Sequence, residues 1–501
     1  MKSKLFGILF IGIALTGCKK YLDVYPETSL SSETFFKKEA DFQQAINAAY
    51  VPLRPIFNDH NWVLGELHSD NSYYARNVMF GAEEQTQNHA DFNLPLVDGL
   101  TTNTRVRDLY RLYYQVIART NQVLFSIDEI DFDATSKNNI KGQAYFLRGF
   151  AYLELTRFFG KVPLHLTPIK DRSEAAVPLA ETEALYTQIE SDLKEATQLL
   201  KNKTDQEAGR VTSGSAWTAL ANLYLIQKRW EDAEDAAEAV ITSNQYSLIG
   251  EYEDVFSTST ENKNNEESVF EVQYMEGSGG YQSSFIYAFM PRPISIDELK
   301  PIFQTSNTTS LAEEGKNIPT PDLIAAYEAN DKRKDATIAY VTISGSQRTN
   351  KTYPYIRKYA KPHAVHGNTG INWPVYRYAE VLLFMAEALN EQDKTGDAAT
   401  FLNRVRNRAG LPNTTASGKE AMREAIFRER RVELAFENKR WNDIVRMDKI
   451  QEIIVPYGER VKANPLDYYY PDGYSAPSNA FTNLEKYFGL PADEAALTPH
   501  F

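Results

Sequence analysis

Apolar residues recur at helical spacing between residues 377 and 447, which is the clearest pattern in the chain. The apolar positions form two groups: Tyr378, Leu382, Met385, Ala386 and Leu389, and then Ala398, Leu402, Val405 and Ala409. Gly396 with Asp397 indicates the end of one helix and the start of the next, and Gly410 indicates the end of the second. The pattern predicts an antiparallel helix pair of the tetratricopeptide kind.

The same order of apolar and small residues occurs earlier in the chain. Its positions are Trp217, Leu220, Ala221 and Tyr224, followed after a turn by Ala233 and Ala237. Recurrence at separated sites predicts helical hairpins stacked side by side. Helical patterns extend over about 30–60, 104–250 and 375–450. The predicted fold class is therefore mainly α, with tetratricopeptide-like helical hairpins, long loop-rich insertions and a few short strands.

Two insertions interrupt the helical pattern, at about 61–103 and 250–372. The first mixes aromatic and hydrogen-bonding residues without a period, and the second contains an alternating run from Phe270 to Tyr274 that predicts a short strand. Loops on a rigid scaffold often carry binding residues, and aromatic faces can stack on sugar rings. We predict ligand contacts at Trp62, Asp70, Tyr73, Tyr74, Tyr281, Phe285 and Tyr287. For each of them, packing in the core is the competing interpretation.

A third helix is predicted from about Lys419 to Asn438, and it carries Glu429, Glu433 and Glu437 four residues apart. Residues at this spacing share a face, and arginines lie within a turn of them. As chemistry, paired acids could act as a general acid and base. As structure, they could form ion pairs that clamp the helix to its neighbours. The second interpretation is favoured, because nothing nearby supplies a nucleophile or a set of metal ligands.

The first 17 residues have the features of a lipoprotein signal peptide. Lys2 and Lys4 precede an apolar run that is too short to span a bilayer, and residues 15–18 read Leu-Thr-Gly-Cys, which has the form of a bacterial lipobox. Cys18 is the only cysteine in the chain, and we predict that it is the lipidated first residue of the mature protein. Acyl chains contribute about 0.8 kcal/mol per buried methylene, so a lipid anchor of several chains holds a protein stably to a membrane.

Length, composition and missing motifs limit the number of domains and the classes of protein that fit the chain. With 501 residues and 43% hydrophobic content the chain can bury a large core, and no Pro/Gly/Ser-rich linker divides it, so we predict a single domain over 18–501. The net charge of −13 does not fit a nucleic-acid-binding protein. Motifs of zinc proteases, serine hydrolases and nucleotide-binding enzymes are missing. His363 and His366 are a close pair without a third ligand nearby in sequence, so no metal, cofactor or catalytic residue is predicted.

The motifs themselves resemble a known family. RYAEVLLFMAEALNE at 377–391, LNRVRNRAG at 402–410 and IFRERRVELAFENKRWNDIVR at 426–446 resemble the C-terminal signature of the SusD/RagB family, the surface lipoproteins that partner TonB-dependent transporters in Bacteroidota. The resemblance implies a non-enzymatic protein, lipid-anchored to the outer membrane and facing the exterior. It also implies that this protein captures an oligosaccharide or polysaccharide and delivers it to a SusC-like TonB-dependent transporter.

Three alternatives stay open at this stage. One is a member of the same family that captures peptides, and another is a tetratricopeptide assembly protein with no transport role. The least favoured is a surface glycoside hydrolase, since acids are plentiful but no feature selects a pair of them. The identity of the ligand depends on how the loops are placed in space, which the sequence does not specify.

Overall fold

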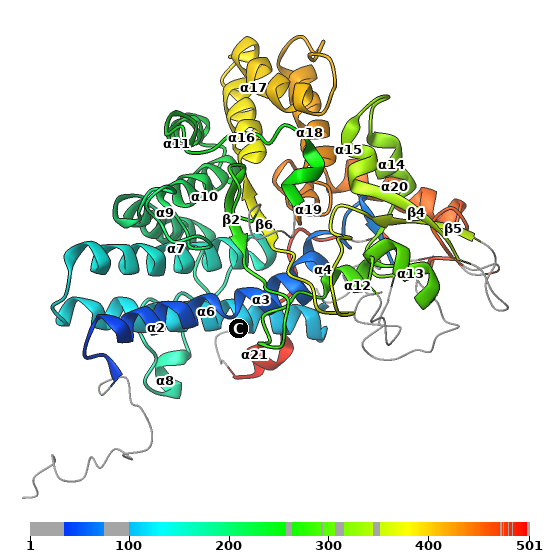
Figure 1. The fold of residues 1–501 in the computed structure, drawn as a ribbon. Helices are drawn as coiled ribbons and strands as arrows, with labels where there is room; N and C mark the ends of the chain where they lie inside the picture. Colours follow the sequence, from blue (N-terminus) through cyan, green and yellow to red (C-terminus); the bar gives the residue numbers. More distant parts are fainter. Residues whose placement is uncertain are drawn as a thin grey trace, which may run out of the picture.

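The computed structural model describes residues 35–74, 100–256, 263–291, 294–305, 315–343 and 351–470, with shorter pieces at 473, 475–478, 480–482 and 484–497. In Figure 1 the long helices lie side by side on the left and at the top, and short helices and strands gather on the right. Cys18 and the predicted signal peptide lie outside the described residues. No helix in the described part is long and apolar enough to cross a membrane.

The scaffold consists of long helices that pack on one another in chain order. Their bounds are α2 Glu39–Tyr50, α6 Thr104–Ser126, α7 Ala134–Phe159, α9 Thr182–Leu199, α10 Ser213–Ile226, α11 Trp230–Thr242, α16 Tyr378–Glu391, α17 Thr395–Arg408 and α18 Lys419–Glu433. Although a long insertion separates α11 from α16 in sequence, these two helices pack directly together. The two hairpins predicted from the apolar pattern are therefore neighbours in one stack, as predicted (Figure 1).

Local sequence signals explain where several helices begin and end. The Asp133 side chain accepts a hydrogen bond from the backbone N–H of Ser136 and caps α7, and Thr212 forms a capping box with Ser215 at the start of α10. At the end of α7, Gly160 has a φ of +70°, and a Cβ there would lie 3.1 Å from the ring of Tyr487. Only glycine meets both conditions without strain, so α7 stops at this position.

Two predicted boundaries differ from the structure. α17 begins at Thr395 rather than after Gly396. The turn between α16 and α17 is made at Asp393, which has the left-handed conformation with a φ of +64°, and not at Gly396. α18 ends at Glu433 rather than near 438, because Phe436 and Asn438 both have positive φ values and cannot continue a helix. The chain after Glu433 therefore leaves the helix axis, and the positive φ values at Phe436 and Asn438 turn it toward α19 (Arg440–Arg446).

Within the residues that the structure describes, the insertions and the segment just before α16 carry three separate two-stranded antiparallel sheets. The strand pairs are β1 Ser72–Tyr73 with β3 Ile318–Pro319, β2 Ser268–Val272 with β6 Trp373–Arg377, and β4 Ile338–Ile343 with β5 Lys351–Ile356. The short helices are α3 Leu53–Pro55, α4 Asn61–Gly65, α8 Arg172–Ala175, α12 Phe285–Phe289, α13 Ile296–Phe303, α14 Pro321–Ala326, α15 Lys332–Thr337, α19 Arg440–Arg446, α20 Ile450–Ala463 and α21 Ala492–Leu497. The strand predicted around residue 270 is β2, and every one of its residues is buried.

Candidate ligand-binding site

Trp62, Phe285 and Tyr287 lie in the interior, each with an exposed fraction of 2%. The Trp62 Nε1–H donates a hydrogen bond of 2.9 Å to the carbonyl of Asn58. Phe285 packs edge-on against Trp373, with ring centroids 5.0 Å apart. Trp62 packs on Phe289 and Tyr287 packs on Phe303, so the three rings lie in the interior of the insertion region and have little surface to offer a ligand.

Tyr287 contacts both His363 and His366, the close pair noted in the sequence. Its hydroxyl oxygen lies 2.5 Å from Nε2 of His363, whose Nδ1 is 2.9 Å from the carbonyl of Lys361. His366 packs against the same tyrosine ring with centroids 4.2 Å apart. In the described ranges, no three His, Cys, Asp or Glu side chains gather in a way that could hold a metal ion.

Tyr73, Tyr74 and Asp70 are also buried. The Tyr73 hydroxyl hydrogen-bonds to that of Tyr470, which ties β1 to the C-terminal region. Together with the three rings above, six of the seven predicted contact residues are interior, and their burial argues against direct contact with a ligand at the surface. The irregular spacing of these aromatics reflects packing under loops, and only Tyr281 keeps its predicted place at the surface.

Asp70 is held by two arginines. Its Oδ1 is 2.7 Å from Nε of Arg440, and its Oδ2 is 2.9 Å from Nη2 of Arg431. Burial by itself would raise the pKa of Asp70, but the two guanidinium groups outweigh it and lower that pKa to about 2. Asp70 therefore joins the first insertion to α18 and α19 as a charged structural group.

We expect Asp70→Asn to lower the free energy of unfolding by about 2–4 kcal/mol at pH 7, because two buried guanidinium groups lose their counter-charge. The folded pKa is below the unfolded one, so this stabilisation is present above about pH 4 and is lost as the pH falls toward 2. Urea unfolding of both proteins at pH 7, 4 and 3 measures the difference. A gap between variant and wild type that stays constant or widens at low pH would contradict this role.

Tyr281 lies on the surface, with an exposed fraction of 45%, beside a groove of about 440 Å³. The walls of the groove come from three other segments, the end of α2 with α3, residues 207–210, and β2. The guanidinium carbon of Arg54 lies 4.7 Å from the centre of the Tyr281 ring, and its Nε–H donates to the carbonyl of Gln273 at 3.3 Å. We call this the Tyr281 groove.

Polar side chains in the groove are held in place by other hydrogen bonds. Arg210 donates from Nη2 to Asn47 at 2.7 Å and from Nε to Glu207 at 2.6 Å. Gln273 exchanges hydrogen bonds with Asn264 in both directions. An exposed aromatic ring with a few fixed donors and acceptors is the usual composition of a site for a polar organic ligand. No sequence pattern points to Arg54, Arg210 or Gln273, because these residues meet only in the folded chain.

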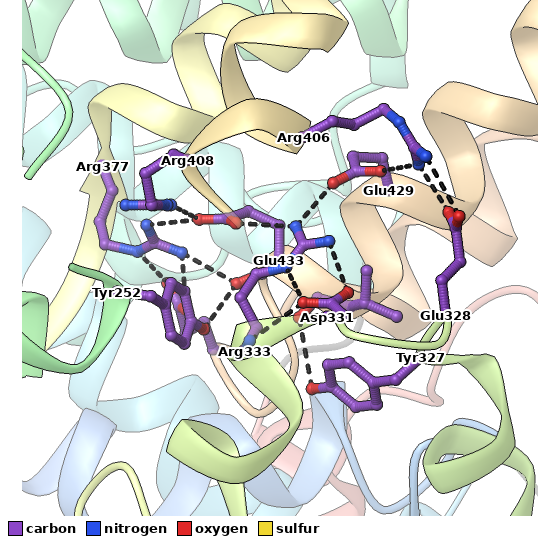
Figure 2. Close-up of polar contacts among 12 residues, drawn as sticks. Tyr252, Tyr327, Glu328, Asp331, Arg333, Arg377, Arg406, Arg408, Glu429 and Glu433 are labelled. Carbon is purple, nitrogen blue, oxygen red and sulfur yellow. Dashed lines mark hydrogen bonds and ion pairs between the residues drawn. The ribbon is translucent and has the colours of Figure 1, made fainter. Parts of the chain in front are cut away.

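A buried ion-pair lattice joins α18 to the second insertion (Figure 2). Its members are Glu267, Asp331, Glu429, Glu433, Glu437, Arg333, Lys358, Arg377, Arg406 and Arg408. Glu429 bridges Arg333 at 2.6 Å and Arg406 at 3.0 Å. These contacts confirm the interpretation of the acidic helix as a structural clamp, although the arginines come from α15, β6 and α17 rather than from α18 itself.

Glu433 is at the centre of the lattice (Figure 2). Its carboxylate lies 3.0 Å from Arg333 and 3.0 Å from Arg377, and it also pairs with Arg408. Burial would raise the pKa of Glu433, but the guanidinium groups outweigh burial and lower it. The carboxylate is therefore charged in the interior, where each oxygen has cationic donors.

The lattice also fixes one wall of the Tyr281 groove. Glu267 precedes β2, and its two carboxylate oxygens pair with Arg377 at 2.5 Å and Arg408 at 2.9 Å. Because β2 runs from Ser268 to Val272 and leads directly to Gln273, these ion pairs hold that wall against the scaffold. The ion-pair lattice therefore stabilises the position of β2 in the groove wall.

Two family models match the chain. One, described as SusD family, matches residues 325–499, and the other, described as starch-binding associating with outer membrane, matches residues 20–225. The SusD-like protein P2 of Formosa agariphila is 28% identical over 92% of this chain and 94% of its own. The starch-binding protein SusD of Bacteroides thetaiotaomicron is 25% identical over 61% of this chain and 64% of its own.

Solved structures show the same architecture. A SusD homologue from Bacteroides thetaiotaomicron superposes with a TM-score of 0.75 at 20% identity, covering 94% of this chain and 97% of that one. A laminarin-binding SusD-like protein superposes with a TM-score of 0.71 at 25% identity, covering 92% and 98%. The predicted fold class, mainly α and SusD-like, is confirmed by these likenesses.

Proposed function

The chain belongs to the SusD/RagB family, and from this premise we propose that it captures a glycan in the Tyr281 groove and delivers it to a partner TonB-dependent transporter. The observation that carries the proposal is the exposed Tyr281 ring beside a groove with fixed polar groups. Relatives named as starch-binding and laminarin-binding support glycan as the ligand class.

The chemistry of the groove suits a neutral sugar. Sugar rings present C–H faces that pack on aromatic rings, and their hydroxyls need both donors and acceptors nearby. Arg54 and Arg210 supply donors, and Glu207 and Glu271 supply charges of opposite sign, so the formal charges of the described lining residues cancel. A groove of this kind binds without catalysis, and we assign no catalytic role to any residue.

Affinity gel electrophoresis of the soluble form, residues 19–501, against arrayed polysaccharides tests the ligand class. We expect at least one glycan to retard the protein without release of new reducing ends. Retardation by no glycan, with capture of peptides on a parallel array, would replace the glycan with a peptide ligand. New reducing ends would overturn the non-enzymatic assignment.

Membrane attachment through Cys18 is part of the same proposal, because a tether keeps a capture protein beside its transporter. We expect Cys18→Ser to move the protein from the membrane fraction to the soluble fraction, since it removes the acylated thiol. Fractionation of cells that express each form measures this. Equal membrane content in the two strains would contradict lipid anchoring at Cys18.

A further inference from the structure

A second cavity, of about 360 Å³, lies among the ends of α7, α9, α10 and α16, the helices α18 and α19, and residues 486–487. None of the residues that line it lines the Tyr281 groove. Its described lining holds six cationic side chains, Arg157, Lys228, Arg430, Lys439, Arg446 and Lys486, and three acidic ones, Glu380, Asp443 and Asp448. We call it the basic pocket, since its formal charge of +3 contrasts with a chain whose net charge is −13.

Arg430 is a buried cation of the pocket, and one of its hydrogen-bond donors has no acceptor. Arg430 is buried, its Nε–H donates to Asp443 at 2.9 Å, and its Nη2 donates to Glu380 at 3.1 Å. Its guanidinium face covers the Phe384 ring at 5.0 Å, but Nη1 is buried without a hydrogen-bond partner. A charged donor left without an acceptor in the interior is costly, and because Nη1 is closed off from the cavity, Arg430 contributes positive charge to the wall of the pocket rather than an open hydrogen-bond donor.

Other cations of the pocket are already paired. Arg446 pairs with Glu387 and with Asp443 at 2.9 Å, and Lys439 pairs with Glu380 at 2.8 Å. Arg157 pairs with Glu154, so two of the three lining acids, Glu380 and Asp443, balance the remaining buried cations of the wall. In the described residues, the lining charges without an ion pair are Lys228, Lys486 and Asp448, and their net charge is +1.

Two of the six cations lie at the mouth of the pocket. Lys228 and Lys486 are exposed, and within the part of the chain that the structure describes neither forms an ion pair. Lys228 is held in the turn between α10 and α11 with a φ of +57°. The aromatic rings of Tyr186 and Tyr487 complete the lining and give it flat walls. The Lys486 ammonium lies 5.0 Å from the centre of the Tyr487 ring. Two exposed ammonium groups without an ion pair beside flat aromatic rings are together suited to a small ring that carries a negative group.

We propose that the basic pocket binds the anionic group of a small polar ligand, a carboxylate, sulfate or phosphate carried on a sugar-sized ring. Lys228 and Lys486 donate charge-assisted hydrogen bonds to the anion at the mouth, and the charge of Arg430 in the wall adds attraction at longer range. The tyrosine rings pack on the ring of the ligand. This site is separate from the Tyr281 groove and adds a second, charge-selective subsite to the protein.

Isothermal titration of the soluble form at fixed ionic strength tests the proposal with glucose 6-phosphate, glucose 6-sulfate, glucuronate, inorganic phosphate and glucose. We expect at least one anion to bind and glucose not to bind. The double variant Lys228→Ala/Lys486→Ala should weaken anion binding at least tenfold, because both residues are exposed cations at the mouth. Inorganic phosphate binding as tightly as glucose 6-phosphate would assign the affinity to the anion alone and would overturn the role of the tyrosine walls.

The matched control is Lys300→Ala/Lys332→Ala, which removes two exposed lysines that lie outside the pocket, on α13 and α15. It should bind anions as wild type does, and Tyr281→Ala should do the same, since Tyr281 belongs to the other groove. The proposal is overturned if no anion binds, or if the two double variants lose affinity equally. Because glycan retention at the Tyr281 groove is scored separately, failure here does not depend on that result.

Discussion

Replacing Glu433 with alanine is expected to lower the free energy of unfolding by about 3–5 kcal/mol. The carboxylate is fully buried and contacts Arg333, Arg377 and Arg408. Removing it leaves guanidinium groups in the interior with less counter-charge and adds a cavity, and both effects destabilise the folded state. Urea unfolding of the soluble form, followed by circular dichroism, measures the change.

A matched surface pair provides the control. Arg357 and Glu253 are 2.8 Å apart, but their side chains are 39% and 48% exposed. Glu253→Ala should therefore cost less than about 1 kcal/mol, because water screens the pair and solvates whichever charge is left. If Glu433→Ala cost no more than Glu253→Ala, the lattice would not be the clamp that joins the insertion to α18.

Tyr281→Ala is expected to weaken glycan binding roughly 10-fold to 100-fold. The substitution removes an exposed aromatic face, and the loss of buried area together with ring stacking amounts to about 1.5–3 kcal/mol. Stability should change by less than about 0.5 kcal/mol, because the ring is 45% exposed. Tyr281→Phe should retain most of the affinity, since it keeps the ring face. Titration with the glycan found by the array measures all three proteins.

Tyr340 offers a control of the same residue type. It lies on β4, is 54% exposed, and does not line the Tyr281 groove. Tyr340→Ala should bind the glycan as wild type does. Equal loss in the two variants, or no loss in Tyr281→Ala, would remove Tyr281 from the binding site.

The helical stack was predictable because its signal is local and periodic. Leu382 and Ala386 on one helix, and Leu220 and Tyr224 on another, are four residues apart and therefore lie on the same side of their helix, and the structure buries all of them. The ion-pair role of Glu429 and Glu433 was likewise predictable, since these acids are four residues apart on a helix. Their partners were not predictable from the sequence, because Arg333 is 96 residues from Glu429 and contacts it only in the folded chain.

The site was harder to predict for the same reason. Tyr73 and Tyr281 both lie in stretches without a period, yet one is fully buried and the other is 45% exposed. Tyr73 is buried because it packs in a cluster with Tyr468 and Tyr470, the latter 397 residues away in the sequence. Arg54 and Gln273 form the groove across 219 residues of sequence, and no local pattern signals such a meeting.

Amide hydrogen exchange, measured with and without glycan, tests whether a glycan binds in the Tyr281 groove. Residues 47–54 and 268–281 supply most of the groove, so exchange in both segments should slow when the glycan is bound. At a glycan concentration near the wild-type Kd, this slowing should be largely lost in Tyr281→Ala, because its affinity is expected to be roughly 10-fold to 100-fold weaker. Slowed exchange confined to other parts of the protein, with these two segments unaffected, would contradict the account.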